Sequence, residues 1–374
     1  MTDCVWDDLV GQRRAAGFLR RAAESGSVSH AYLFVGPTGT GKKTAARALA
    51  CALYCDDNGC GSCHACRRVR ASSHPDVHVL APEGAASEYL IDQVRDVVHD
   101  VSLKPIEASH KVYIFQDGRF NDAAANAFLK TLEEPPLDVV IVLLADDYDD
   151  VLPTIASRCQ VVRFSPVPES TARALVMERT GASEDEARAA LAAAGQVIPR
   201  AIDFLRSAGR RNARATIMGI LKRLTVMDGH DVLKAARELL TAVRAPLEET
   251  KGVQAEEAEA ARDYLSKGLS KRMDQRHKRE LTAAERDGIG EILSVTESWL
   301  RDCLVIAKGM PEFVNNVDTA DATAEVAAAI SVPAAIRALD CVRTARGRIA
   351  YNVSPQLVVE AMLFDIQEVL RCPR

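Results

Sequence analysis

The sequence has no long hydrophobic run and no apolar leader at its start. No stretch approaches the roughly 18 uninterrupted apolar residues of a membrane-spanning helix. The opening residues, MTDCVWDDLV, have neither the basic nor the apolar region of a secretory signal. The chain also has no internal repeat of fixed period, and its formal net charge of −5 argues against a surface that binds nucleic acid all over. We therefore expect a soluble, cytoplasmic protein.

What is present indicates two or three globular domains. The 374 residues, 48% of them apolar, can form a core in each domain. Up to about residue 165, short runs rich in Val, Ile, Tyr and Phe alternate with helical patterns, which predicts an α/β domain with a parallel sheet covered on both faces by helices. The five expected strands are residues 31–36, 77–82, 111–117, 139–145 and 160–164.

Only helical patterns follow this α/β domain. A capping box from Ser183 to Glu186 opens one helix. Another helix begins near Pro355, and its apolar positions 357, 358, 361, 362, 366, 369 and 370 form one stripe that is expected to be buried. We therefore expect three domains: an α/β domain at 1–166, a small helical domain at 167–208 and an all-helical domain at 209–374. An acidic stretch at 246–261 is interpreted as a connector within the last domain.

The segment GPTGTGKKTAA, residues 36–46, follows the first expected strand and nearly matches the phosphate-binding P-loop, GxxxxGK followed by Ser or Thr. Gly36, Gly41 and Lys42 fit the pattern, and Gly39 gives the loop a third glycine. In such a loop backbone N–H groups hold phosphate oxygens and the lysine reaches the terminal phosphates. The hydroxyl that holds Mg²⁺ is replaced by the ammonium of Lys43, so the loop has lost one metal ligand.

A second metal position is altered as well. P-loop ATPases hold Mg²⁺ with an Asp at the end of the third strand, and a Glu after it orients the attacking water. This sequence has Gln116 and Asp117 there. A neutral amide is a poorer Mg²⁺ ligand than a carboxylate. Two changes around the same ion predict that ATP hydrolysis has been lost.

Four closely spaced cysteines lie between the P-loop helix and the second strand: Cys55, Cys60, Cys63 and Cys66. In a cytosolic chain this spacing fits a structural Zn²⁺ bound by four thiolates better than it fits disulfides. His64 is a competing ligand, although four cysteines already complete a closed site. Cys51 lies one helical turn before Cys55 and is expected in the core.

The segment ASRCQ places Ser157 and Arg158 at the end of a helix, immediately before the fifth strand. Taken alone, an arginine at such a position is typical of a surface ion pair.

Together these stretches resemble the clamp-loader branch of the AAA+ ATPases, and most closely the delta-prime family of bacterial DNA polymerase III. The matching pieces are WDDLVGQ, SHAYLFVGPTGTGKK, the four-cysteine loop, SSHPDVHVL, AANAFLKTLEEPP, LPTIASRC and NVSPQLVVEAMLF. They cover the first ~165 residues densely and the C-terminal region sparsely. The resemblance implies a P-loop AAA+ domain with a zinc-binding insertion at 55–66, a helical lid and an all-α C-terminal collar.

The resemblance also assigns roles to individual residues. Arg158, with Ser157, would reach the ATP of a neighbouring subunit as an arginine finger in trans. Asp146 stands where active relatives carry a hydroxyl residue, which is a third change against hydrolysis.

The resemblance also implies which residues would contact a nucleotide. Val10, Gly11 and Gln12 would flank an adenine pocket. Arg200, in GQVIPRA, would be the nucleotide-facing arginine of the small helical domain. The spacing between the first two cysteines is shorter than in many relatives, which affects the geometry of the loop but not the set of ligands.

The resemblance implies a stator that hydrolyses no ATP itself, binds structural Zn²⁺ and works within the DNA-directed DNA polymerase (nucleotidyltransferase) holoenzyme. Its partners would be the gamma/tau ATPase and delta subunits in a hetero-pentamer, the sliding clamp, and primer-template DNA reached through the assembly. One alternative is an active gamma/tau-type ATPase subunit, which should have an intact GKT or GKS and an Asp-Glu pair. A different class, a zinc-dependent DNA-binding module, would use the basic stretch 266–280.

Overall fold

A computed structural model describes residues 4–82, 88–261, 288–350 and 353–371. The chain forms two compact units, Met1–Thr171 and Ala172–Arg374, and each is described by itself. The boundary lies within a few residues of the expected end of the α/β domain. The further division into lid and collar is not resolved by these two units and stays a prediction.

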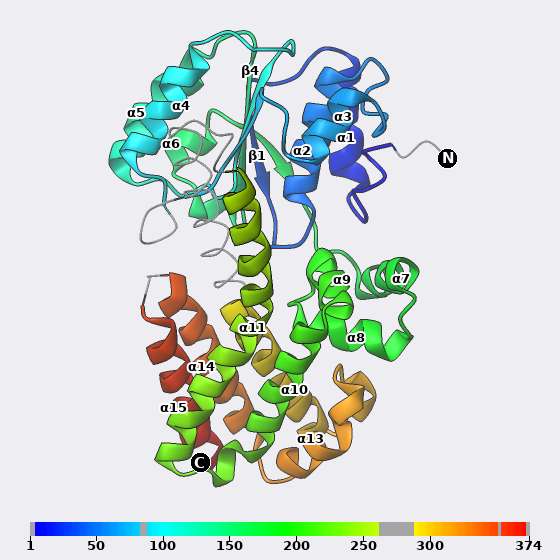
Figure 1. The fold of residues 1–374 in the computed structure, drawn as a ribbon, viewed down its shortest axis with the longest axis vertical. Coiled ribbons are helices and arrows are strands. Elements are labelled where there is room, and N and C mark those ends of the chain that lie inside the picture. The colour runs from blue at the N-terminus through cyan, green and yellow to red at the C-terminus, as the bar shows by residue number, and fades with distance from the viewer. Residues whose placement is uncertain (1–3, 83–87, 262–287, 351–352, 372–374) are drawn as a thin grey trace. The chain divides into compact units, whose positions relative to one another are not determined.

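The first unit is built on a five-stranded parallel sheet (Figure 1). Its strands are β1 (Ala31–Val35), β2 (Val77–Leu80), β3 (Lys111–Phe115), β4 (Val139–Ala145) and β5 (Gln160–Arg163), in the order β2-β3-β4-β1-β5. All five expected strands are confirmed. Because the strands are parallel, the segments that follow β1, β3 and β4 emerge at the same edge of the sheet, where ligand sites form in open α/β folds.

Helices cover both faces of this sheet (Figure 1). They are α1 (Arg13–Glu24), α2 (Lys42–Tyr54), α3 (His64–Arg70), α4 (Ile91–Val101), α5 (Asp122–Glu133) and α6 (Pro153–Ala156), with a short 3₁₀ turn η1 (Tyr148–Asp150). Successive strand side chains point to opposite faces. Tyr32 and Phe34 of β1 accordingly pack in the core beneath α1 and α2, whereas Leu33 packs in the core beneath α4 and α5.

The second unit consists of helices within the described residues. They are α7 (Glu169–Thr180, which begins just before the unit boundary), α8 (Glu184–Ala193), α9 (Ile198–Arg206), α10 (Ala208–Arg223), α11 (Gly229–Ala261), a helix over 288–307, α13 (Ala320–Ala327), α14 (Val332–Ala350) and α15 (Pro355–Arg371), with 3₁₀ turns η2 (Leu224–Val226), η3 (Pro311–Phe313) and η4 (Val317–Thr319). The predicted capping box is present, since Ser183 and Glu186 bond each other's backbone N–H. The expected fold class, an α/β P-loop sheet followed by helices, is confirmed.

Two expectations for the second unit have different outcomes. The acidic stretch 246–261 is not a connector, because α11 continues through it to Ala261 as one helix. Its Ala, Glu, Lys and Gln content favours a helix, and this overrides the interpretation of its charge as a linker. The basic stretch 266–280 lies outside the described residues. Among the helices that are described, none has an apolar stretch long enough to cross a membrane.

Candidate functional site

The P-loop lies where the sequence predicts it, between β1 and α2. Two glycines make its path possible. Gly36 passes so close to β5 that an added Cβ would overlap the carbonyl oxygen of Phe164. Gly41 is the N-cap of α2 with φ +90°, a left-handed conformation that favours glycine. Both positions therefore favour glycine, as the P-loop pattern does.

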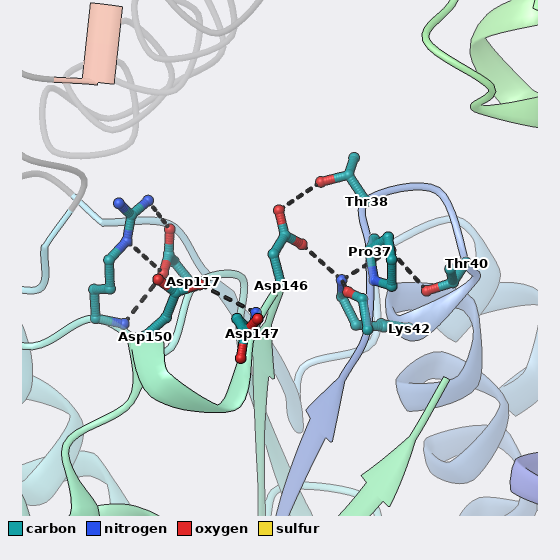
Figure 2. Close-up of polar contacts among 10 residues, drawn as sticks. Pro37, Thr38, Thr40, Lys42, Asp117, Asp146, Asp147 and Asp150 are labelled. Carbon is teal, nitrogen blue, oxygen red and sulfur yellow. Dashed lines mark hydrogen bonds and ion pairs between the residues drawn. The ribbon is translucent and has the colours of Figure 1, made fainter. Parts of the chain in front are cut away.

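The lysine of this loop is bonded within its own chain (Figure 2). Lys42 is buried, with 9% of its side chain exposed, and its Nζ lies 2.7 Å from Oδ1 of Asp146. The same Nζ donates to the carbonyl oxygens of Gly36 and Pro37. Asp146 also accepts a hydrogen bond from Thr38 Oγ1 at 2.7 Å. One carboxylate thus binds two side chains of the loop, the lysine and a threonine.

Sheet topology explains how Asp146 reaches the loop. Strand β4 is the direct neighbour of β1, and their register pairs Val35 with Ala145. The next residue of each strand, Gly36 and Asp146, therefore leaves the sheet at the same level. This brings the end of β4 beside the start of the P-loop.

The two altered metal positions contact each other. Lys43 Nζ lies 3.3 Å from Oε1 of Gln116, so an ammonium and an amide stand where a hydroxyl and a carboxylate would hold Mg²⁺. Burial, followed by the nearby charge of Arg47, lowers the pKa of Lys43. This pair offers no carboxylate to a metal ion.

Asp117 is engaged by a neighbour in sequence. Its carboxylate accepts hydrogen bonds from Nε of Arg119 at 3.1 Å and Nη2 at 2.7 Å, and from the backbone N–H of Arg119 at 3.1 Å. The side chain is therefore held within its own turn instead of being free to orient a water molecule.

The three residues expected to flank an adenine line one cavity of the first unit. Val10, Gly11 and Gln12 line it together with residues of the segment after β5, among them Ser165 and Pro168. Gln12 is buried, donates from Nε2 to the carbonyl oxygen of Ser165 and accepts from its N–H, which ties the start of α1 to the segment after β5. Arg200 belongs to the second unit, so its role toward a nucleotide stays a prediction.

Arg158 lies on the surface directly after α6, with 35% of its side chain exposed. Its Nε and Nη2 donate to the same oxygen, Oε1 of Glu133, at 3.0 and 2.5 Å. Its Nη1 donates to the carbonyl oxygen of Thr154 at 2.8 Å and lies 3.3 Å from Oγ of Ser157. The guanidinium is thus held on two sides while remaining accessible from solvent.

The four predicted cysteine ligands converge. The sulfur atoms of Cys55, Cys60, Cys63 and Cys66 all lie within 4.8 Å of one another. A tetrahedral Zn²⁺ with bonds of about 2.3 Å would place its sulfurs about 3.8 Å apart, so the four thiols fit a metal ion with small adjustments. Backbone N–H groups point at three of the sulfurs, those of Cys55, Cys60 and Cys63.

Cys51 and His64, which lie near the four cysteines in the sequence, are not part of the cluster. Cys51 is 1% exposed, and burial raises the pKa of its thiol to about 11, which keeps it protonated in the core. His64 is exposed at the start of α3 and is not part of the cysteine cluster.

Sequence reasoning missed three partners in these sites: Thr38 beside Asp146, Arg119 beside Asp117, and Glu133 beside Arg158. The contact of Arg119 could have been predicted, because this residue lies only two positions after Asp117 and carries the opposite charge. The other two contacts depend on strand order and helix packing, which cannot be deduced from the sequence alone. Glu133 lies in the matching segment AANAFLKTLEEPP, but the resemblance assigned it no role.

Comparison with known proteins identifies similar chains. The family described as "DNA polymerase III, delta subunit" matches residues 11–168. A DNA polymerase III subunit delta' of Bacillus subtilis is 32% identical over 59% of this chain and 67% of its own length. The corresponding subunit of Pseudomonas aeruginosa is 37% identical over 59% of this chain and 65% of its own length. A DNA polymerase III subunit tau of Bacillus subtilis is 37% identical over 46% of this chain but only 30% of its own length.

Proposed function

Because the chain belongs to the delta-prime subunit family of bacterial DNA polymerase III, we propose that it is the non-hydrolysing stator of a clamp loader. In this role it completes the ATP site of a neighbouring ATPase subunit by presenting Arg158. The assembly then loads a sliding clamp onto primed DNA. The proposed partners are gamma/tau ATPase and delta subunits in a hetero-pentamer joined through C-terminal helices.

One observation carries the non-hydrolysing part of the proposal. Asp146 accepts from both Lys42 and Thr38, so a carboxylate of the chain itself binds the lysine that reaches the phosphates in active ATPases. A bound triphosphate would have to displace this carboxylate from the lysine. The contact between Lys43 and Gln116 adds to this, because no acidic side chain or hydroxyl there would hold Mg²⁺.

The finger part of the proposal is supported by how Arg158 is presented. Phosphoryl transfer spreads negative charge over the transferred group, and a guanidinium from outside the site can stabilise it. Arg158 follows α6, whose Ile155 and Ala156 are buried, and its side chain reaches the surface. A residue anchored in this way can be aimed at a neighbouring subunit.

The second candidate is an active gamma/tau-type ATPase, which the similarity to the tau subunit favours. An active subunit needs a hydroxyl after Lys42 and a free pair of acidic residues after β3. Here the corresponding residues are Lys43, Gln116 and an Asp117 bonded to Arg119. These contacts support the stator instead.

We further propose that Cys55, Cys60, Cys63 and Cys66 hold one structural Zn²⁺. The ion would supply cross-links among the loop after α2, the start of α3 and the surrounding core. It would take no part in phosphoryl transfer, because four thiolates close its coordination shell.

The experiment that tests the stator is the rate of ATP hydrolysis by the purified full chain, alone and then mixed with its partner subunits. We expect negligible turnover from the chain alone and substantial turnover from the assembly. Turnover by the isolated chain that matches the turnover of the assembly would support the gamma/tau-type alternative and reject the stator.

A further inference from the structure

We propose that Glu133 is a positioning residue for Arg158: it fixes the guanidinium so that its remaining N–H groups face away from this chain. The inference rests on the proposed function, because it concerns how the finger is aimed. It adds a residue of the LEEPP turn, Leu132 to Pro136, to the machinery that acts on the neighbouring nucleotide.

The hydrogen bonds of Arg158 within this chain use some of its N–H groups and leave others available. A guanidinium has five N–H donors in a rigid plane. The single N–H of Nε and one N–H of Nη2 are directed at Oε1 of Glu133, and one N–H of Nη1 is directed at the carbonyl oxygen of Thr154. The remaining N–H of Nη2 has no acceptor among the described residues, and that of Nη1 has only the long contact to Ser157. These donors can serve an anion outside the chain.

Glu133 is itself fixed by the end of its helix. It is the last residue of α5, and Leu132 beside it is buried in the core under the sheet. Pro135 and Pro136 follow, and proline cannot continue a helix. The carboxylate therefore projects from a rigid helix end, whereas Arg158 alone is a long side chain with many rotamers.

Two opposite effects of Glu133 on the finger can be compared. As a competitor, its negative charge would hold Arg158 back from a phosphate. As a positioning residue, it would restrict Arg158 to a geometry that leaves the outer N–H groups available. Both bonds to Glu133 use one carboxylate oxygen and one edge of the guanidinium, so they do not cover the outer edge. This geometry favours positioning, and removal of Glu133 should slow the reaction.

The test uses the full chain assembled with its partner ATPase and delta subunits, and measures steady-state ATP hydrolysis on primed DNA with the clamp present. The Arg158-dependent rate is defined as the wild-type rate minus the rate with Arg158→Ala. We expect Glu133→Ala to lower the Arg158-dependent part of kcat about two- to fivefold, the factor that corresponds to an exposed ion pair. The KM for ATP should not change, because an interaction made only in the transition state affects kcat.

Three further variants separate positioning from a structural role. Glu133→Gln keeps an acceptor oxygen and should restore part of the rate. Glu134→Ala removes the same charge one residue away, where the side chain makes no hydrogen bond or ion pair within the described residues, and should behave as wild type. The double variant Glu133→Ala with Arg158→Ala should equal Arg158→Ala alone, because Glu133 acts only through Arg158.

The outcomes distinguish the positioning role of Glu133 from the finger role of Arg158. If Arg158→Ala leaves the rate unchanged in complexes of intact size, the finger is wrong and the positioning role is wrong with it. If Arg158→Ala slows the complex but Glu133→Ala and Glu133→Gln do not, only the positioning role is rejected. A faster rate in Glu133→Ala, or a further loss in the double variant, would also overturn it. Should Glu133→Ala fail to assemble, Glu133→Gln decides alone.

Discussion

Replacing Asp146 with Asn should allow the P-loop to bind nucleotide more tightly. In the wild-type chain the carboxylate of Asp146 lies 2.7 Å from Nζ of Lys42, and this ion pair competes with any phosphate for the lysine. The amide of Asn keeps an oxygen that can accept from Thr38 but carries no charge. The substitution therefore removes the competing charge while keeping the size of the side chain and one hydrogen bond of the loop.

The size of this effect follows from two contributions. Asp146 is 60% exposed, so its ion pair with Lys42 contributes at most about 1 kcal/mol after solvent screening. Repulsion between the carboxylate and a phosphate charge about 4 Å away adds about 1 kcal/mol in water. Removing both should strengthen binding by about 1–2 kcal/mol, which is a factor of about 5–30 in the dissociation constant.

The assay is titration of the purified chain with a fluorescent, non-hydrolysable ATP analogue, with and without Mg²⁺. Asp149→Asn is the matched control, since it makes the same charge change on η1 and its side chain has no hydrogen bond or ion pair among the described residues. Mg²⁺ should add little affinity in any variant, because Lys43 and Gln116 remain. If Asp146→Asn and Asp149→Asn both bind as the wild type does, Asp146 does not restrict the phosphate site.

Two further predictions concern the first unit. The chain should purify with one Zn²⁺, and Cys60→Ser should lower the metal content and the unfolding temperature, whereas Cys341→Ser, in the second unit, should keep the metal; unchanged metal in Cys60→Ser would reject the site. Gly36→Ala should lower the free energy of unfolding by about 1–3 kcal/mol, because its Cβ would overlap the backbone oxygen of Phe164. Gly17→Ala in α1 meets only the flexible end of Arg21 and should not destabilise; equal unfolding curves for the two variants would contradict the packing argument.

The local parts of the fold could be predicted from sequence. Five strands appear within a few residues of their expected bounds, because doubly buried strands have continuous apolar runs and clear turn residues around them. The cysteine cluster was predicted for a similar reason, since its four members lie close in the chain.

Contacts that depend on packing could not be predicted in this way. The change at Asp146 was expected to oppose hydrolysis, but its bond to Lys42 was not expected. The two residues are 104 positions apart in the chain, and the pairing of β4 with β1 brings them together. The apolar stripe of α15 was partly wrong: Leu357 is exposed, whereas Val359 and Leu363 are buried. This helix contacts both α14 and α11, so its buried face is wider than a single stripe.

The central claim is that this chain completes the ATP site of its neighbour while hydrolysing no ATP itself. The most direct test is Arg158→Ala in the assembled complex, confirmed as intact by its size, with ATP hydrolysis and clamp loading measured together. A finger is worth about 10³–10⁵ in rate at the site it serves, so both activities should fall. Arg158→Lys should restore them only in part, because an ammonium lacks the planar fork. Wild-type hydrolysis and loading by intact Arg158→Ala complexes would contradict the account.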